Sequence, residues 1–564
     1  MPPLNTLFTA CRDNLVNDVL RIIKKEQKKG RLASFIDEEV GGDTCLTVAM
    51  KLGRLEVVEI LVEKGGADVH KVSHFQPGRN GAAGTFSHTP LMMACSGMFN
   101  NQLSLSYARC LVEKGGADVN HVNHVESSRG ISALHAACID NNNALAEYLI
   151  EKGADVNKSS LQAGFPLFVS SMKGHAEVAE LLLANGAKVD QGHSDDVTPL
   201  MASSQDGHVE VVKLLLANGA NVDLANRDGD TPLMMSCDRE HHEVVRLLLA
   251  GGASVDQATN DGYTPLVQSS GRGRHRMVKL LLAGGAEVNQ ADTNGSTPLI
   301  ASSQNGHQEA AKLLLANGAK VDQARNDGAT PLIMSSQDGH VEVVKLLLAG
   351  GAEVDQANNN GATPLFMSIQ EGHREVAKLL LAGGASVDKT DKDGFSPLMH
   401  CSMGGHHRLV KLLLASGAEV DQTKDDGFTP LIASSMKGHA EVVKLLLANG
   451  ANAGLENNGG ATALSVSYQN GHSEVAELLL AAAGAEARSE RAAEAQKAQK
   501  EEGKPKKVAR VCEKCGKEAK KMKKCSVCQL VRYCSEECQL EDWKEHKKSC
   551  KKMAAAREEG GKGR

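Results

Sequence analysis

Apolar and polar residues follow one another along most of this chain in a pattern that returns every 33 residues. Each copy begins with Thr or Ser, usually followed by Pro and Leu, and Ser132 and Phe165 begin weaker copies in the same register. The regular copies begin at Thr198, Thr231, Thr264, Thr297, Thr330, Thr363, Ser396, Thr429 and Thr462. A fixed period of this length indicates a solenoid of stacked repeats.

The first half of the copy that spans Thr330 to Ala362 predicts a short helix. Thr330 suits the N-cap, because its hydroxyl can accept a hydrogen bond from an unpaired N–H of the first turn. Pro331 fits the first helical position, where its missing N–H costs nothing. We expect this helix to end near Gln337 and to be separated from the next one by Gly339.

The second half of the same copy predicts a second helix with one apolar stripe. Val344, Leu347 and Leu348 lie at i, i+3 and i+4 and therefore share a face. Gly350 and Gly351 end the helix, where a left-handed residue is favoured. Two short helices cannot bury such a stripe alone, so each copy needs neighbours.

This unit resembles the ankyrin repeat, whose motif combines Thr-Pro-Leu-His with a Gly-His step and a glycine-terminated second helix. The matching segments are Thr330–Leu332, Gly339–His340 and Leu347–Ala352. The His that follows Leu in the family is replaced by an apolar residue in the regular copies that begin at Thr198 through Thr429, and only His135 keeps it. The resemblance therefore leaves open what ties the first helices together.

Histidine recurs instead at the start of the second helix. It stands in register at 175, 208, 241, 307, 340, 373, 406, 439 and 472. Some of these histidines form His-x-Glu, a combination also found in zinc deaminases. The repeat accounts for them better, since they fall at one structural position.

The first 131 residues carry the repeat less regularly. Copies begin at Thr44 and Thr89, but the spacing grows to 45 and then to 43 residues before Ser132. The extra residues fall partly in hairpin loops, where repeat proteins accept insertions. Counting a degenerate first copy as a cap, we expect about 14 repeats over 1–485, irregular over 1–131 and strictly periodic over 132–485.

Three further segments follow the solenoid. Residues 486–510 contain a run of Ala, Glu, Gln, Lys and Arg, which predicts a charged helical linker. Residues 511–551 hold seven of the 14 cysteines and predict a small separate domain, and residues 552–564 predict a disordered charged tail. The expected fold class is therefore α, a solenoid of helix-turn-helix repeats with hairpin loops followed by a small metal-binding finger.

Charge and cysteine usage narrow the classes of partner and compartment. Residues 501–564 hold 19 Lys and Arg against 11 Asp and Glu, whereas residues 1–500 hold 44 against 58. An acidic solenoid argues against nucleic acid as its ligand. Several scattered cysteines share one helical position, which suits a reducing compartment. Because no signal peptide and no long apolar run are present, we expect no membrane span and a cytoplasmic or nuclear location, or both.

One segment has the spacing of metal ligands. Two C-x2-C pairs, two cysteines four apart and a His–Cys pair four apart give eight ligands with none left over. Structural zinc takes four such ligands tetrahedrally, so we expect two closed, non-catalytic sites. A domain of about 40 residues also needs the metal in order to fold. The eight ligands are Cys512, Cys515, Cys525, Cys528, Cys534, Cys538, His546 and Cys550.

Residues 512–550 resemble the MYND zinc finger, including Arg532-Tyr533-Cys534 and Asp542-Trp543. The resemblance implies interleaved ligands, with Cys512, Cys515, Cys534 and Cys538 on one zinc and Cys525, Cys528, His546 and Cys550 on the other. It also implies a module that binds proline-rich peptides, as in corepressors of the ETO type. Ser526, Gln539 and Trp543 match the peptide-contacting positions, although Trp543 fits a small core with Tyr533 equally well.

The residue before each Thr-Pro-Leu varies between copies. In the ankyrin family this residue lies on the loop that lines the concave side. Tyr263, Phe395 and Phe428 are the aromatic examples, and exposed aromatic side chains are frequent anchors of protein interfaces. We therefore expect these three residues to bind a partner, the alternative being local packing against the next hairpin.

Together these features predict a monomeric, non-enzymatic adaptor. The solenoid is expected to bind one protein and the finger a proline-rich motif in another. The alternatives are an accessory or regulatory subunit of a chromatin or signalling enzyme, and nucleic-acid contact through the basic C-terminal region. An enzyme is disfavoured because the repeats leave no room for a catalytic domain, and no phosphate-binding loop or open metal site stands out.

Overall fold

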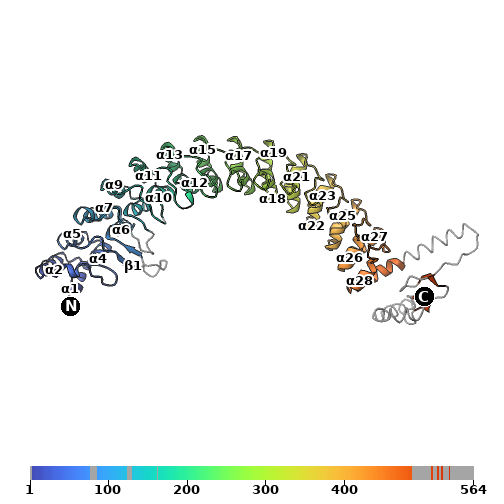
Figure 1. Ribbon diagram of the computed structural model, residues 1–564, viewed down its shortest axis with the longest axis horizontal. Coiled ribbons are helices and arrows are strands. Elements are labelled where there is room, and N and C mark those ends of the chain that lie inside the picture. Colours follow the sequence, from blue (N-terminus) through green and yellow to red (C-terminus); the bar gives the residue numbers. More distant parts are fainter. Residues whose placement is uncertain are drawn as a thin grey trace, which may run out of the picture. The chain divides into compact units, whose positions relative to one another are not determined.

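The computed structural model describes residues 3–75, 86–122, 130–161 and 163–484, together with four two-residue strands farther along the chain. The chain divides into two compact units, Met1–Leu479 and Leu480–Arg564. In the first unit, antiparallel pairs of helices stack side by side in sequence order (Figure 1). No helix among the described residues is both long enough and apolar enough to cross a bilayer.

Each repeat contributes a first and a second helix to two separate layers (Figure 1). The first helices are α1 (Pro3–Arg12), α4 (Cys45–Lys51), α6 (Pro90–Cys95), α8 (Ala133–Ile139), α10 (Pro166–Lys173), α12 (Pro199–Asp206), α14 (Pro232–Asp238), α16 (Pro265–Gly271), α18 (Pro298–Gln304), α20 (Pro331–Gln337), α22 (Pro364–Gln370), α24 (Pro397–Met403), α26 (Pro430–Lys437) and α28 (Ala463–Gln469). The short helix α3 (Leu32–Phe35) and the 3-10 turn η2 (Ser194–Asp196) lie in connections between repeats.

The second helices form the other layer. They are α2 (Val16–Lys28), α5 (Leu55–Glu63), α7 (Asn101–Arg109) continued by the π-helical turn η1 (Cys110–Lys114), α9 (Asn143–Glu151), α11 (Ala176–Ala184), α13 (Val209–Ala217), α15 (His242–Ala250), α17 (His275–Ala283), α19 (Gln308–Ala316), α21 (Val341–Ala349), α23 (Arg374–Ala382), α25 (His407–Ala415) and α27 (Ala440–Ala448). A last helix covers residues 473–484.

The local chemistry of each repeat explains its helices. The hydroxyl of Thr330 accepts the backbone N–H of Ile333 at 3.2 Å, so the expected N-cap of α20 is confirmed. Gly339 has a φ of 77°, which allows the turn between the two helices. The buried stripe of α21 is centred on Val343, Val344 and Leu347, whereas the predicted Leu348 is only half-buried.

One continuous hydrophobic core runs through the first unit, from Leu7 to Leu479. First helices pack on the first helices of adjacent repeats, and second helices pack on second helices. Because each repeat contacts only its neighbours, the stability of the array comes from a sum of similar interfaces.

The irregular repeats near the N-terminus carry a small hairpin. Strand β1 (Ser73–Phe75) pairs antiparallel with β2 (Phe86–His88), and Ser73 lies opposite His88. The hairpin precedes α6 and lies in the first of the two long insertions. Part of the extra length is thus paired strand.

The second unit contains two short antiparallel ladders. Strand β3 (Arg510–Val511) pairs with β4 (Glu518–Ala519). Strand β5 (Lys523–Lys524) pairs with β6 (Arg532–Tyr533). The remaining residues of 485–564 lie outside the described part of the chain, and with them nearly all of the expected linker and the whole of the tail.

Candidate functional site: a groove on the repeats and a metal-binding segment

Successive repeats are tied together by the histidines at the start of the second helices. Nε2 of His208 donates to the carbonyl oxygen of Met172 at 3.0 Å, and Nε2 of His241 donates to that of Gln205 at 2.9 Å. The same bond, always to the carbonyl oxygen 36 residues earlier in the sequence, is made by His175, His307, His340, His439 and His472. These bonds supply the link that the sequence left open and explain why the family's other histidine can be replaced.

In most junctions the glycine before the histidine makes room for the next repeat's imidazole. Gly207 has a φ of 76°, and a Cβ there would lie 2.4 Å from the ring of His241. The rule has exceptions: a Cβ at Gly372 would meet nothing within 4 Å, Asn141 stands in a glycine position with a φ of 53°, and Glu240 stands in another with a φ of 62°. The following repeat has Arg274 in place of histidine. Arg274 bonds the carbonyl of Cys237 at 2.9 Å and lies 3.6 Å from a Glu240 oxygen.

His135, the residue that keeps the family's motif, has a different role. Its Nδ1 lies 2.8 Å from the Ser132 hydroxyl and its Nε2 lies 3.1 Å from the carbonyl oxygen of Gly164. The side chain is fully buried. Burial lowers the pKa of His135 to about 4, since the charged ring would lose its hydration.

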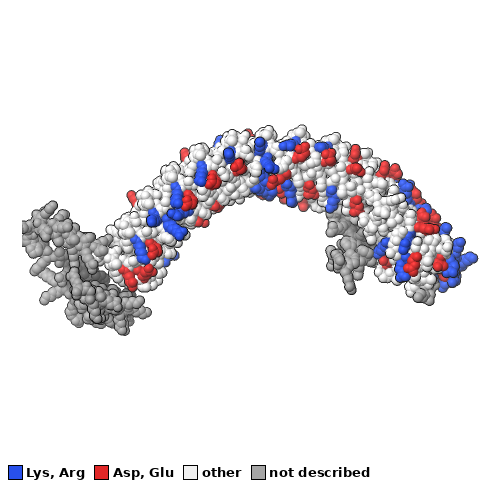
Figure 2. Space-filling view, turned by 180° about the vertical axis from the view of Figure 1, so that it is seen from behind, with Lys and Arg blue, Asp and Glu red and all other residues white. Residues whose placement is uncertain are grey.

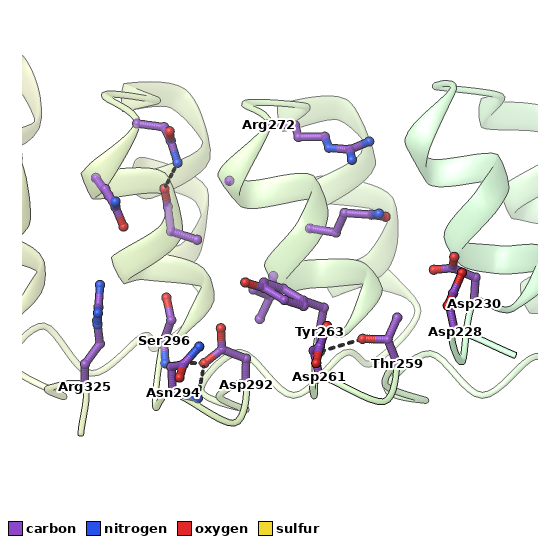
Figure 3. Close-up of a pocket in the computed structure, with 16 residues that line it drawn as sticks. Asp228, Asp230, Thr259, Asp261, Tyr263, Arg272, Asp292, Asn294, Ser296 and Arg325 are labelled. Carbon is purple, nitrogen blue, oxygen red and sulfur yellow. Dashed lines mark hydrogen bonds between the residues drawn. The ribbon is translucent and has the colours of Figure 1, made fainter. Parts of the chain in front are cut away.

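A hollow of about 600 Å³, called the groove below, lies on the side of the central repeats that the first helices form. Figure 3 shows its walls, formed by hairpin loops at 228–230, 259–263 and 292–296 together with residues of α16 and α18. Tyr263 lies between the loop that carries Asp228 and Asp230 and the loop that carries Asp292 and Ser296 (Figure 3). The hollow therefore extends over more than one repeat.

One repeat lacks a side chain in the wall of the hollow. Gly271 occupies a position that is filled in other copies by Gln205, Asp238, Gln304, Gln337, Gln370, Met403, Met436 and Gln469. A Cβ at Gly271 would meet the Cβ of Ala301 at 3.4 Å and would make no closer contact. Backbone geometry therefore does not require glycine here. The absence of a side chain at Gly271 leaves the surface open.

The loops that line the groove are fixed to one another. The backbone N–H of Asn260 donates to the carbonyl of Asp228 at 3.1 Å, and that of Thr293 donates to the carbonyl of Asp261 at 3.2 Å. Within the next loop, the carboxylate of Asp292 accepts two backbone N–H groups, at 2.9 and 2.7 Å. The walls are thus held in position without a ligand.

The cations around the groove are already paired. Arg272 contacts the carboxylate of Asp238, and Nη2 of Arg325 lies 3.1 Å from a carboxylate oxygen of Asp327. Arg325 stands where most loops have Asn, Asp or Thr, and Asp327 takes over the capping role by accepting the N–H of Ala329 at 3.0 Å. Figure 2 shows basic and acidic side chains together on the inner edge of the central repeats.

The structure places the three aromatic candidates in different surroundings. Tyr263 is 41% exposed and lines the groove. Phe428 packs against the core, and the ring of Phe395 lies 4.4 Å from Nζ of Lys424 in the next hairpin. Only Tyr263 joins the groove. Sequence reasoning missed Gly271 as a contributor, although its departure from the common Gln was visible in the repeat alignment.

The solenoid residues that the structure describes hold neither a cluster of metal ligands nor an exposed cysteine. Among them, no group of three or more His, Cys, Asp or Glu side chains could hold a metal ion. The cysteines of the solenoid are buried and unbridged, and burial raises the pKa of the Cys237 thiol to about 12. A thiol of this kind stays protonated and is a poor nucleophile.

The metal-binding segment lies mostly outside the described residues, and so do all eight expected ligands and Ser526, Gln539 and Trp543. In the sequence, the described strands flank several of the ligands. Cys512 and Cys515 fall between β3 and β4, Cys525 and Cys528 fall between β5 and β6, and Cys534 directly follows β6. Seven thiolates and one imidazole form a donor set that suits zinc.

Comparison with protein families agrees with the fold. The ankyrin-repeat model (three copies) matches eight overlapping ranges between 71 and 490, and the single ankyrin-repeat model matches residues 41–74. The MYND finger model matches residues 512–550. The chain therefore belongs to the ankyrin-repeat proteins, and it carries a C-terminal MYND finger, a type of domain that binds zinc.

Among solved structures, the chain is similar to the ankyrin repeat domain of human ASB11. The two share 32% identity over 39% of this chain and 98% of that one, with a TM-score of 0.36. Comparison with curated proteins finds no match. Ankyrin repeats and MYND fingers are both typically non-catalytic modules of protein interaction, which defines the architecture of this chain as one for binding proteins.

Proposed function

We propose that the chain is a non-enzymatic adaptor whose solenoid binds a protein partner at the groove beside Tyr263. The observation that carries the proposal is the combination of an open surface at Gly271 with the exposed aromatic side chain of Tyr263. Exposed aromatic residues in well-formed concavities are typical binding anchors. The position of the groove among tightly bonded loops supports binding without rearrangement.

The groove can be closed with a side chain that the repeat already accepts. The variant Gly271→Gln adopts the residue found at this position in several other copies, so it should fold normally. The matched control is Met403→Gln, which makes the same residue at the same position away from the groove. Tagged full-length proteins are isolated with their bound partners, and the partners are quantified by mass spectrometry.

The proposal expects a defined set of partners to be lost with Gly271→Gln and with Tyr263→Ala, and retained with Met403→Gln. An unchanged set of partners in both groove variants contradicts it. Circular dichroism of all three variants checks that folding is unaffected.

The finger supports a second contact in the same adaptor. Its donor set provides for two structural zinc ions, with the ligands divided as the MYND resemblance implies. Proline-rich peptides are the proposed ligands, at Ser526, Gln539 and Trp543. Binding of a proline-rich peptide array to the full chain should weaken with Trp543→Ala at constant zinc content. A variant with full zinc content and undiminished binding excludes this peptide site.

A further inference from the structure

We infer that the groove beside Tyr263 binds an extended, arginine- or lysine-bearing peptide segment of the partner. The inference rests on the proposed function and names the chemistry of its ligand. Its basis is the chemistry of the groups around the hollow, which include four aspartates and two arginines.

The carboxylates at one end of the groove are available to a ligand. In the part of the chain that the structure describes, no donor or cation bonds the carboxylates of Asp228, Asp230 or Asp261, although all three line the hollow. The neighbouring Arg227 is engaged elsewhere, at 3.2 Å from Asp195 and 3.4 Å from Asp196. Negative charge on this side of the groove is therefore not compensated from within the protein.

The helix side of the hollow adds a further acceptor. Oε1 of Gln268 is buried and has no hydrogen-bond partner within the described residues. The corresponding positions of other repeats hold mainly apolar residues, among them Ala202, Ala301 and Met334. Nε of Arg325, a donor, is also unpaired but belongs to the residue at the far end of the groove (Figure 3). A buried acceptor without a partner favours a guest that brings N–H donors.

Tyr263 also favours a ligand with a guanidinium or ammonium group. Its exposed ring lies between the loop of Asp228 and Asp230 and the loop of Asp292 (Figure 3). A guanidinium or ammonium group stacked on such a ring is attracted by the negative face of the π-system. A guanidinium can in addition form two parallel bonds with a carboxylate, which makes arginine the better fit.

The distance between adjacent repeats sets the interval between the basic residues of the bound peptide. Packed helices lie about 8–10 Å apart, and an extended chain advances about 3.3 Å per residue. Every third residue of an extended segment would therefore meet an equivalent point on the next repeat. A peptide with arginine at every third position matches the groove better than one with consecutive arginines.

The test uses full-length protein and a fluorescent nonapeptide with three arginines at every third position in a Gly-Ser background. Three control peptides carry Gln or Glu in place of Arg, or the three arginines in a row. Fluorescence anisotropy should show the spaced arginine peptide binding most tightly. Its affinity should fall at least tenfold in Asp228→Asn/Asp230→Asn, in Tyr263→Ala and in Gly271→Gln.

A charge-matched control separates the groove from diffuse attraction to an acidic array. Glu177→Gln/Glu180→Gln removes two negative charges from α11, in the other helix layer, and should change the affinity less than twofold. Equal weakening by both double variants, or preference for the Glu peptide, overturns the inference.

The two proposals fail separately. If Gly271→Gln removes protein partners but the arginine peptide binds no better than its Gln control, the groove binds partners of another chemistry. If Gly271→Gln weakens the peptide and leaves every partner bound, the proposed function is wrong, and the basic-peptide site remains.

Discussion

Nε2 of His208 donates to the carbonyl oxygen of Met172, at 3.0 Å, from the beginning of one repeat's second helix to the end of the preceding repeat's first helix. The bond satisfies a carbonyl that the end of α10 leaves without a helical partner. It thus stabilises the interface between repeats. Met201, at the position of the family's conserved histidine, can accordingly be a buried apolar residue.

Replacing this histidine should weaken one interface of the array. We expect His208→Ala to lower the free energy of unfolding by about 1 kcal/mol, the typical net value of one hydrogen bond. Hydrogen exchange should accelerate in α10 and α13, which the interface joins. His275→Ala, at an exposed histidine of α17 outside this ladder, is the control and should change neither quantity measurably.

The irregular junction at Glu240 should behave as a coupled pair. Arg274→His alone should destabilise the array, because it removes the contacts of the guanidinium with Asp238 and Glu240. Adding Glu240→Gly should recover most of this loss by recreating the common Gly–His arrangement. A double-mutant cycle in urea should give a favourable coupling of about 0.5–3 kcal/mol. Purely additive effects would show that the two positions are independent.

Stability should fall in mild acid because of His135. Above pH 6.5 the imidazole is neutral in both states, but below it the unfolded chain binds a proton that the folded chain resists until about pH 4. The folded state therefore loses up to about 3 kcal/mol between these values, from a shift of this size. Urea midpoints measured from pH 7.5 to 4 should decline less steeply for His135→Gln. Parallel pH profiles for the two proteins contradict this assignment.

The metal content of the finger should be two zinc ions per chain. Cys512→Ser and Cys525→Ser should each lower the content towards one, because the MYND resemblance places these residues on different ions. Metal analysis of the full-length chain after dialysis measures this. Loss of both ions from either variant would indicate that the two sites fold as one unit.

The regular part of the fold follows from local chemistry and was predictable. Thr330, Pro331 and Gly339 each act through their own backbone neighbourhood, so the bounds of α20 could be derived from the sequence. The ankyrin identity and the MYND finger were likewise predictable, from motif and spacing. Helix positions in such an array depend little on distant contacts.

The groove was predictable only in part, because it depends on contacts between repeats. Tyr263 could be singled out as a variable loop residue, but so could Phe395 and Phe428. The ring of Phe395 contacts Nζ of Lys424, and Phe428 packs against the core. The space beside Gly271 arises from what its neighbours on α18 leave uncovered. The role of the histidine ladder also required the position of the preceding repeat.

The Gly–His contact has a consequence for the length of the molecule. Since each regular junction pairs the same two residue types at the same offset, removal of residues 297–329 would bring Gly273 opposite His340, two residues already suited to each other. Regular repeats can therefore be deleted or duplicated as whole units without redesigning a junction. The repeats that meet through Glu240 and Arg274 are an exception and can be gained or lost only together.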